Sequence, residues 1–383
     1  MGSFLKNNLE LTALVDINER GVTGALVQPN PKGRNLLRYV TKTRTGGEAT
    51  AVKSVEGLTM AAGEVITELT TEKNSKKQET KKAKNPPKNF IFIISSPFQY
   101  SYITDITREW QRLVKVDDSV INDLLNEKEP NYDDACKIIR SDKKNDLGFI
   151  KKEIHSINLN GYPAKEVKNK QARSISIRLL CSLAPQGVIK ALDSRVKTEM
   201  RSAETKFAPK TDIILEFLNS FPNNGIYSYV DVGLSGTLVV TVADKLPTKF
   251  SYITYGSHDL TNAIATEFQV SMAVASSYTA LYFSGQGEKK FMKRIEEIID
   301  PLLTKWEREY ENNMYNQVIP QNVYFTSDHF LKEKIGSILE KKHPDAEVRS
   351  LDRVYTEATG HEVRDEVLNF AISTYLLKKT KKG

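Results

Sequence analysis

The strongest constraint on the fold lies past the middle of the chain, in residues 227–242, which read YSYVDVGLSGTLVVTV. Two apolar runs rich in β-branched residues flank the turn residues 233–236, so we predict a β-hairpin with Asp231 just before its bend. A carboxylate beside a tight glycine turn can hold a metal-bound phosphate, because backbone N–H groups approach the anion while the acid orients the cation. Ordinary hairpin chemistry is the structural alternative for this pattern.

The chain opens with the same pattern. Residues 11–27, LTALVDINERGVTGALV, contain an apolar run, the acid Asp16, a polar turn with Gly21 and Gly24, and a second apolar run. Two such units, separated by about half the chain, indicate a duplicated architecture with one binding site between the halves.

Size and composition indicate a globular protein of several subdomains. With 383 residues, 39% hydrophobic and 27% charged, the chain is too long for one simple core. Its 55 Lys and Arg exceed its 48 Asp and Glu, but the surplus is concentrated in residues 73–89 and after Leu377. The basic balance therefore predicts no nucleic-acid partner.

Cysteines, histidines and apolar runs indicate the compartment. Cys136 and Cys181 stand far apart, and the five histidines are scattered without metal-ligand spacing, which favours reduced thiols and no metal site of that kind. We recognise no signal peptide and no apolar run near the ~18 residues of a membrane helix. The expected location is the cytoplasm.

Apolar spacing predicts most of the remaining elements. We expect a strand at 36–44 and a helix at 49–71, followed by the lysine-rich stretch 73–89, read as a mobile surface linker and a domain boundary. Such a basic run could also dock an acidic partner or anionic lipid. A compact α+β module follows at 89–184, and long helices are expected at 260–282 and 288–316.

The final predicted helix, 363–379, has an apolar face formed by Val363, Val367, Phe370, Ala371 and Leu377. With its lysines toward anionic headgroups, this helix and the tail that follows, 363–382, could lie on a membrane surface. The alternative is that the apolar face packs on the protein's own domain.

With these pieces placed, the chain resembles the actin-like ATPase superfamily, in the branch that holds the bacterial cell-division protein FtsA and the type IV pilus assembly protein PilM. The first phosphate motif would be VDINERGVTGALV and the second YVDVGLSGTLVV, followed by YGSHDLTNAIA; the adenosine-side motif would be NVYFTSDHF. The module at 89–184, ending in SISIRLLCSLAP, resembles the extra subdomain peculiar to this branch.

The resemblance implies an α/β fold of two duplicated ribonuclease-H-like halves with an inserted α+β subdomain. The first half would comprise 1–88 and 185–222, and the second 223–256 and 318–383. The inserted subdomain would be 89–184, and a mainly helical subdomain would occupy 257–317.

The same resemblance implies a nucleotide site. Asp16 and Asp231 would face each other and hold the hydrated Mg²⁺ of a bound ATP, with Asn18 and Gly21 in the first turn. The phosphates would lie against the second turn, at Gly233, Ser235, Gly236 and Thr237. Two further residues, Gly256 and Thr326, would lie near the ribose and base.

This chain departs from the pattern of the branch at three turns. Asn18, Glu19 and Arg20 replace the small residues of the first turn, and the Glu19 carboxylate would repel a phosphate unless Arg20 or a metal offsets it. Leu234 takes a glycine place in the second turn, and residues 327–329, Ser-Asp-His, replace a run of glycines. The lost glycines predict weak or absent nucleotide binding and little hydrolysis.

Three functions follow from the resemblance. The first is a cytoplasmic actin-like scaffold, forming filaments or assembling with a partner protein of a cell-division or pilus machine at the inner face of the membrane. The second is an active ATP-binding switch of the same fold. The third is a sugar or acid kinase, for which the sequence offers no catalytic base.

Overall fold

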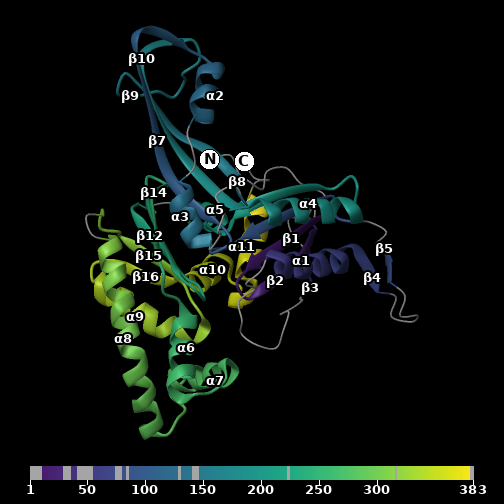
Figure 1. Ribbon diagram of the computed structural model, residues 1–383, viewed down its shortest axis with the longest axis vertical. Coiled ribbons are helices and arrows are strands. Elements are labelled where there is room, and N and C mark those ends of the chain that lie inside the picture. The colour runs from purple at the N-terminus through teal and green to yellow at the C-terminus, as the bar shows by residue number, and fades with distance from the viewer. Residues whose placement is uncertain are drawn as a thin grey trace. The chain divides into compact units, whose positions relative to one another are not determined.

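The computed structural model describes residues 11–28, 36–40, 55–73, 80–82, 86–127, 131–139, 146–221, 225–314 and 317–379. These residues form two compact units, Gln99–Gln186 and the remainder of the chain, and each is described by itself (Figure 1). None of the helices in the described residues has the length and apolarity needed to cross a bilayer.

The first sheet of the larger unit has five strands in the order β11-β6-β1-β2-β3. The hairpin at the start of the chain provides its two antiparallel central strands, with Asp16 opposite Thr23. On the other side of β1, β6 and β11 run parallel. The strands are β1 (Thr12–Asn18), β2 (Gly21–Gln28), β3 (Leu36–Val40), β6 (Asn89–Ile94) and β11 (Glu204–Pro209).

The second sheet repeats this topology, in the order β14-β13-β12-β15-β16. The strands β14, β13 and β12 are antiparallel neighbours. On the other side of β12, the strands β15 and β16 run parallel to it. The strands are β12 (Tyr227–Val232), β13 (Thr237–Ala243), β14 (Leu246–Ile253), β15 (Asn322–Thr326) and β16 (Glu347–Ser350). The duplication predicted from the two acid-and-turn hairpins is therefore confirmed.

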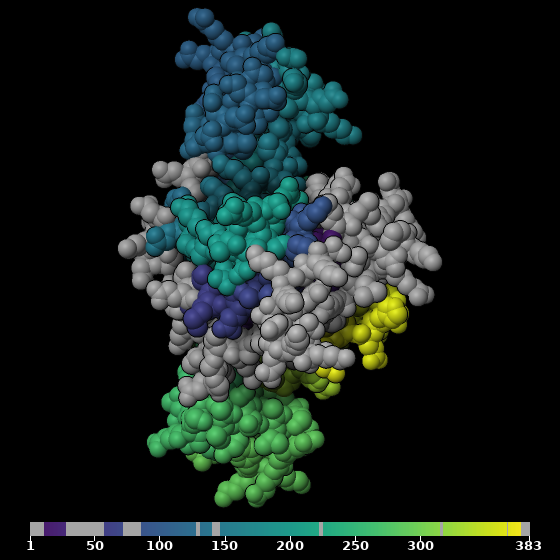
Figure 2. Space-filling view, turned by 90° about the vertical axis from the view of Figure 1, so that its right-hand side faces the viewer, coloured from purple at the N-terminus to yellow at the C-terminus, as the bar shows by residue number. Residues whose placement is uncertain are grey.

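Two helices cover the outer face of the first sheet, α1 (Val55–Thr70) and α4 (Gln186–Glu199). Their apolar stripes bury Leu58, Ile66 and Leu192 against β1, because residues three and four apart share one helix face. The helices also contact each other, since Arg195 on α4 donates to Thr67 on α1 at 2.7 Å, and Figure 2 shows them side by side.

A second core lies between the two sheets. It combines side chains of both sheets with those of α5 (Lys210–Asn219), α10 (Leu351–Thr359) and α11 (Leu368–Lys379). Phe370 is fully buried in this core and Ala371 is 7% exposed, so most of the apolar face predicted for the final helix packs on its own domain. The side chain of Leu377 and residues 380–382 lie outside the described part.

The helical part of the larger unit covers the opposite face of the second sheet. It contains α6 (Ser257–Phe268), α7 (Met272–Phe283), α8 (Lys289–Met314), η2 (His329–Leu331) and α9 (Lys332–Lys342). The single helix expected at 260–282 is wrong, because Gln269 adopts a left-handed backbone conformation with φ of 54° and ends α6. The sequence analysis also missed β11 and α10.

The smaller unit, Gln99–Gln186, is built on a four-stranded antiparallel sheet in the order β7-β10-β8-β9. The strands are β7 (Tyr100–Val116), β8 (Leu147–Leu159), β9 (Tyr162–Pro163) and β10 (Lys170–Pro185), with the helices α2 (Asp118–Glu127) and α3 (Tyr132–Ile139). Leu124 on α2 and Ala135 on α3 are buried in this unit.

The start of the inserted module differs from the sequence prediction. We placed its first strand at residue 89, whereas β6 belongs to the first sheet, between β1 and β11. All six β6 residues are buried, which requires strand partners on both edges and covered faces. The separate unit begins at Gln99.

Most of the predicted lysine-rich linker, 73–89, lies outside the described residues, as do 41–44 of the predicted third strand. Where the structure describes the linker region, β4 (Thr71–Lys73) and β5 (Thr80–Lys82) pair as two antiparallel strands. A short β-ladder therefore replaces part of the expected linker.

The half-buried imidazole of His343 gives a test of the helical part. Burial lowers its pKa, and its Nε2 lies 2.8 Å from the Tyr310 hydroxyl. A depressed folded-state pKa means that this stabilisation is present above the unfolded pKa of about 6.5 and is lost as pH falls through the folded pKa. We expect the Tm to fall between pH 7.5 and 5 by more in the wild type than in His343→Gln. His155 is present in both proteins, so its titration contributes equally to both falls in Tm. Equal falls would therefore contradict the assignment to His343.

Candidate functional site

Asp16 lies near the end of β1 and is almost completely buried, at 2% exposure. Its Oδ2 accepts hydrogen bonds from the side-chain amides of Asn18, at 3.0 Å, and Asn369, at 3.1 Å. Its Oδ1 is buried without a hydrogen-bond partner among the described residues. One carboxylate oxygen therefore accepts two hydrogen bonds, and the other accepts none from the described residues.

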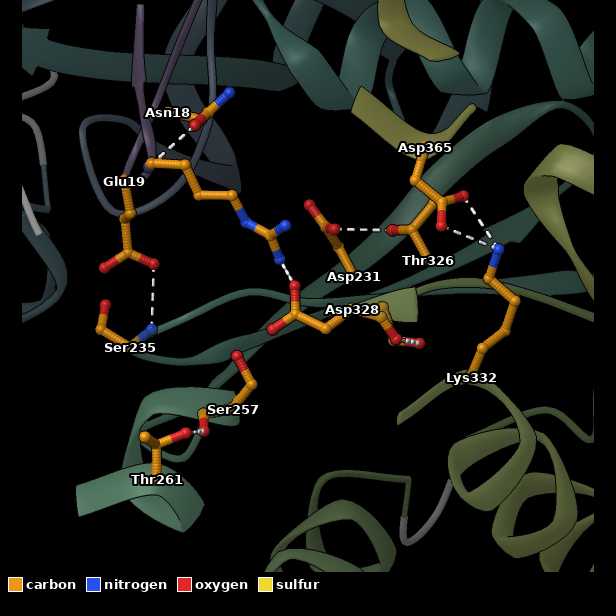
Figure 3. Close-up of polar contacts among 12 residues, drawn as sticks. Asn18, Glu19, Asp231, Ser235, Ser257, Thr261, Thr326, Asp328, Lys332 and Asp365 are labelled. Atoms are coloured by element: carbon orange, nitrogen blue, oxygen red, sulfur yellow. Dashed lines mark hydrogen bonds and ion pairs between the residues drawn. The ribbon is translucent and has the colours of Figure 1, made fainter. Parts of the chain in front are cut away.

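Asp231 occupies the equivalent place on β12 and is held by a half-buried cation. The Lys210 ammonium donates to both Asp231 oxygens at 2.9 Å. The Thr326 hydroxyl donates to Oδ1 of Asp231 at 2.6 Å (Figure 3). Tyr229 in turn lies 2.9 Å from the Thr326 hydroxyl. Lys210 is the first residue of α5, directly after β11, which carries it between the two sheets.

The two carboxylates belong to one electrostatic environment. Burial raises the pKa of Asp16, the positive charge of Lys210 and the amides of Asn369 and Asn18 lower it, and the negative charge of Asp231 raises it. Lys210 therefore acts on both acids, by direct contact with Asp231 and through its charge on Asp16. That the two acids face one site across a cleft stays a prediction.

The second turn, residues 233–236, already has an anion on it. The Ser235 N–H donates to Oε2 of Glu19 at 2.9 Å, and the Gly233 N–H donates to the Gly236 carbonyl at 2.9 Å. Figure 3 shows the Glu19 carboxylate directed at Ser235. Glu19 is only 7% exposed, so the anion on this turn is a buried side chain of the protein.

The rest of the first turn is bound as well. The Asn18 side chain accepts from the Arg20 N–H at 2.8 Å, and the Arg20 guanidinium forms an ion pair with Asp328. Asp328 is 4% exposed, whereas Arg20 is 54% exposed, so the ion pair covers a buried acid with a surface cation. Arg20 thus pairs with Asp328 in the segment after β15.

The surroundings of Thr237 and Gly256 are packed with protein side chains. Trp306 donates from Nε1 to the Thr237 hydroxyl at 2.9 Å, and that hydroxyl donates to the Tyr255 carbonyl. The Lys305 ammonium lies 4.3 Å from the centre of the Tyr255 ring. The remaining cavity beside Gly256 and Trp306 has a volume of about 20 Å³. Such a volume holds about one water molecule and falls far below a typical ligand pocket.

The structure brings most of the predicted site residues together. Asp16 and Asn18 form one hydrogen-bonded group, Asp231 and Thr326 another, and Lys210 acts on both. The remaining predicted residues are in the second turn or beside the small cavity, except for Gly21, which closes the first hairpin with φ of 137°. These remaining residues are Gly233, Ser235 and Gly236 in the turn, and Thr237 and Gly256 near the cavity.

Sequence reasoning missed three residues of the site, Lys210, Asn369 and Trp306. Lys210 could have been found from the Pro209-Lys210 pair, since a proline commonly marks a helix start and would have placed this lysine at the strand-to-helix junction. Asn369 and Trp306 lie on otherwise apolar helix faces, which carry no pattern that distinguishes a site residue from a core residue.

Comparisons with known proteins identify the fold. No protein-family model matches the sequence, and no curated protein matches it. Among solved structures, a chain of the PilM-PilN type IV pilus biogenesis complex is 14% identical, with a TM-score of 0.61, over 98% of this chain and 100% of that one. The chain has the actin-like ATPase fold.

Two further structures with actin-like folds cover nearly the whole chain at lower similarity. An archaeal actin homolog in complex with ADP is 10% identical, with a TM-score of 0.44, over 97% of this chain and 100% of that one. A protein of actin-like ATPase fold and unknown function from Bacteroides thetaiotaomicron is 11% identical, with a TM-score of 0.40, over 98% and 99%.

Proteins with the actin-like fold generally bind a nucleotide with a divalent metal ion. Here the orphaned Oδ1 of Asp16 would suit a cation, but the Lys210 ammonium occupies both oxygens of Asp231. Glu19 takes the Ser235 N–H that a phosphate would need. Within the described part of the chain, no three His, Cys, Asp or Glu side chains are grouped to hold a metal. In this arrangement the residues do not fit a magnesium-bound nucleotide.

Gly256, just before α6, offers a test of how tightly this residue packs against the second turn. A Cβ at this position would lie 2.3 Å from the carbonyl oxygen of Leu234, so Gly256→Ala must push backbone against backbone. We expect it to lower the free energy of unfolding by about 1–3 kcal/mol, the usual range for overpacking.

The matched control is Gly63→Ala, in the interior of α1. Its Cβ would meet Arg195 no closer than 3.6 Å, an ordinary contact, so the higher helix propensity of alanine should leave stability unchanged or raise it by about 0.5–1 kcal/mol. Urea denaturation of both variants makes the comparison. Similar losses of unfolding free energy in the two variants would refute the close approach of Gly256 to the second turn.

Proposed function

We propose that this chain is a cytoplasmic actin-like scaffold protein that works without a nucleotide cycle. In this proposal it assembles with itself or with a partner protein of a pilus or cell-division machine, at the inner face of the membrane. The fold is that of the ATPases, but the site that would drive their cycle carries protein charges where ligand charges are needed.

The single observation that carries the proposal is the contact between Glu19 and the Ser235 N–H, at 2.9 Å. A phosphate on this turn would have to displace the carboxylate or approach it closely. Two unit charges about 4 Å apart repel by about 4 kcal/mol at an effective dielectric constant of about 20. Lys210, on both oxygens of Asp231, opposes a metal ion in the same way.

The likeness to a chain of the PilM-PilN complex supports the proposed kind of partner. In that structure PilM and PilN form a complex of type IV pilus biogenesis. By analogy we propose a protein partner from an envelope machine for this chain. For the membrane we propose a role of the lysine-rich tail sequence, because the apolar residues Phe370 and Ala371 of the final helix are buried.

Calorimetry with Mg²⁺ and ATP tests the nucleotide part. We expect no binding heat from the wild type at ATP concentrations up to about 1 mM, because millimolar affinity corresponds to only about 4 kcal/mol of binding free energy. Micromolar binding that disappears in Asp16→Ala and Asp231→Ala would contradict the proposal and support the alternative, an ATP-binding switch of the same fold.

Electron microscopy and vesicle co-sedimentation test the scaffold part, with purified protein in the absence of nucleotide. We expect filaments, oligomers or coated vesicles, and vesicle binding should require anionic lipid and be lost when residues 378–383 are removed. Neutral vesicles are the control. A protein that stays monomeric and binds no vesicles would contradict self-assembly and membrane association.

A further inference from the structure

Two charged side chains of opposite sign, the half-buried Lys210 and the buried Glu19, lie where proteins of this fold would hold a ligand. The Lys210 ammonium, 16% exposed, is bound to both oxygens of Asp231. Its charge also acts on the buried Asp16 carboxylate. A divalent cation between two carboxylates would have the same electrostatic role, and a buried carboxylate needs such a partner.

The Glu19 carboxylate is the negative charge of this pair. It accepts the Ser235 N–H of the glycine turn at 2.9 Å, and its Oε2 would be in ordinary contact, at 3.5 Å, with a Cβ placed on Gly233. The carboxylate therefore lies directly against the backbone of the turn. Exposed backbone N–H groups in such a turn bind phosphates in other proteins.

The first turn, which contains Glu19 and Arg20, contacts the second of the two duplicated halves. Glu19 reaches the turn of the second sheet, and Arg20 pairs with Asp328 after β15. Asn369 on α11 donates to Asp16 on β1 at 3.1 Å. Contacts that a nucleotide would make to both halves are made here by side chains of the chain itself.

We infer that Lys210 and Glu19 are built-in substitutes for the metal ion and the phosphate of a bound nucleotide, and that they hold the two halves together without any ligand. This inference rests on the proposed nucleotide-free function and explains how that function is maintained. Removing both charges should leave a bare glycine turn next to two carboxylates without a counterion. That arrangement is a site for a magnesium-bound polyphosphate.

The test uses the full chain and the double variant Glu19→Ala with Lys210→Met. Inorganic tripolyphosphate with Mg²⁺ is the probe, because the inference concerns only the metal ion and the phosphates of a nucleotide. We expect calorimetric binding in the double variant and at least tenfold weaker binding in the wild type. The control is Glu297→Ala with Lys293→Met, which removes an exposed ion pair of 4.0 Å on α8 and should behave like the wild type.

Hydrogen exchange gives a second readout that does not require binding. Amides of residues 232–237 and 256–260 should exchange at least tenfold faster in the double variant than in the wild type. Protection should return with Mg²⁺ and tripolyphosphate, but not with either alone. Should the double variant fail to fold, the isosteric Glu19→Gln variant is measured by exchange alone, and it should show faster exchange at Ser235.

The outcomes separate this inference from the proposed function. Binding of ATP by the wild type contradicts the proposed function. A wild type that ignores ATP, with a folded double variant that neither exchanges faster nor binds tripolyphosphate, overturns the inference alone. Equal tripolyphosphate binding by both proteins also overturns it, as does unchanged exchange in Glu19→Gln where that variant replaces the double variant.

Discussion

The structure depends on the neutralisation of two carboxylates, the buried Asp16 and the half-buried Asp231, which occupy equivalent places in its two duplicated halves. Because the two sheets share one topology, Asp16 and Asp231 occupy equivalent strand ends. Two buried acids near each other are unfavourable unless a cation compensates them. Lys210 provides that cation, which requires β11 to end and α5 to begin at this point. Asn18 and Asn369 donate to one oxygen of Asp16, and Thr326 donates to one oxygen of Asp231.

Charges that belong to the chain differ from charges that a ligand brings. A ligand can leave, so a ligand-held state has a lifetime set by its dissociation. Glu19, Arg20 and Lys210 are tethered, and their contacts reform at a high effective concentration whenever they break. Under the proposed function, this favours one persistent state over an alternation of two, which suits a protein that others assemble on.

The sequence was informative where a pattern is local and periodic. The two hairpins, and the acid before each bend, could be predicted because strand alternation and turn residues lie within a few positions of each other. The partners of those acids could not be predicted, because Lys210 and Asn369 reach them across 21 and 353 residues. Gln269 ended a helix without glycine or proline, and β6 had the same apolar run whether it joined the inserted module or the first sheet.

The register of the smaller unit determines how it is attached to the chain. Tyr100, its second residue, lies opposite Leu183, close to its last, in the antiparallel pair of β7 and β10. The polypeptide therefore enters and leaves this unit at the same end of one strand pair. Exchanging this unit for another between Phe98 and Gly187 would therefore require only a replacement whose own two ends lie one strand spacing apart.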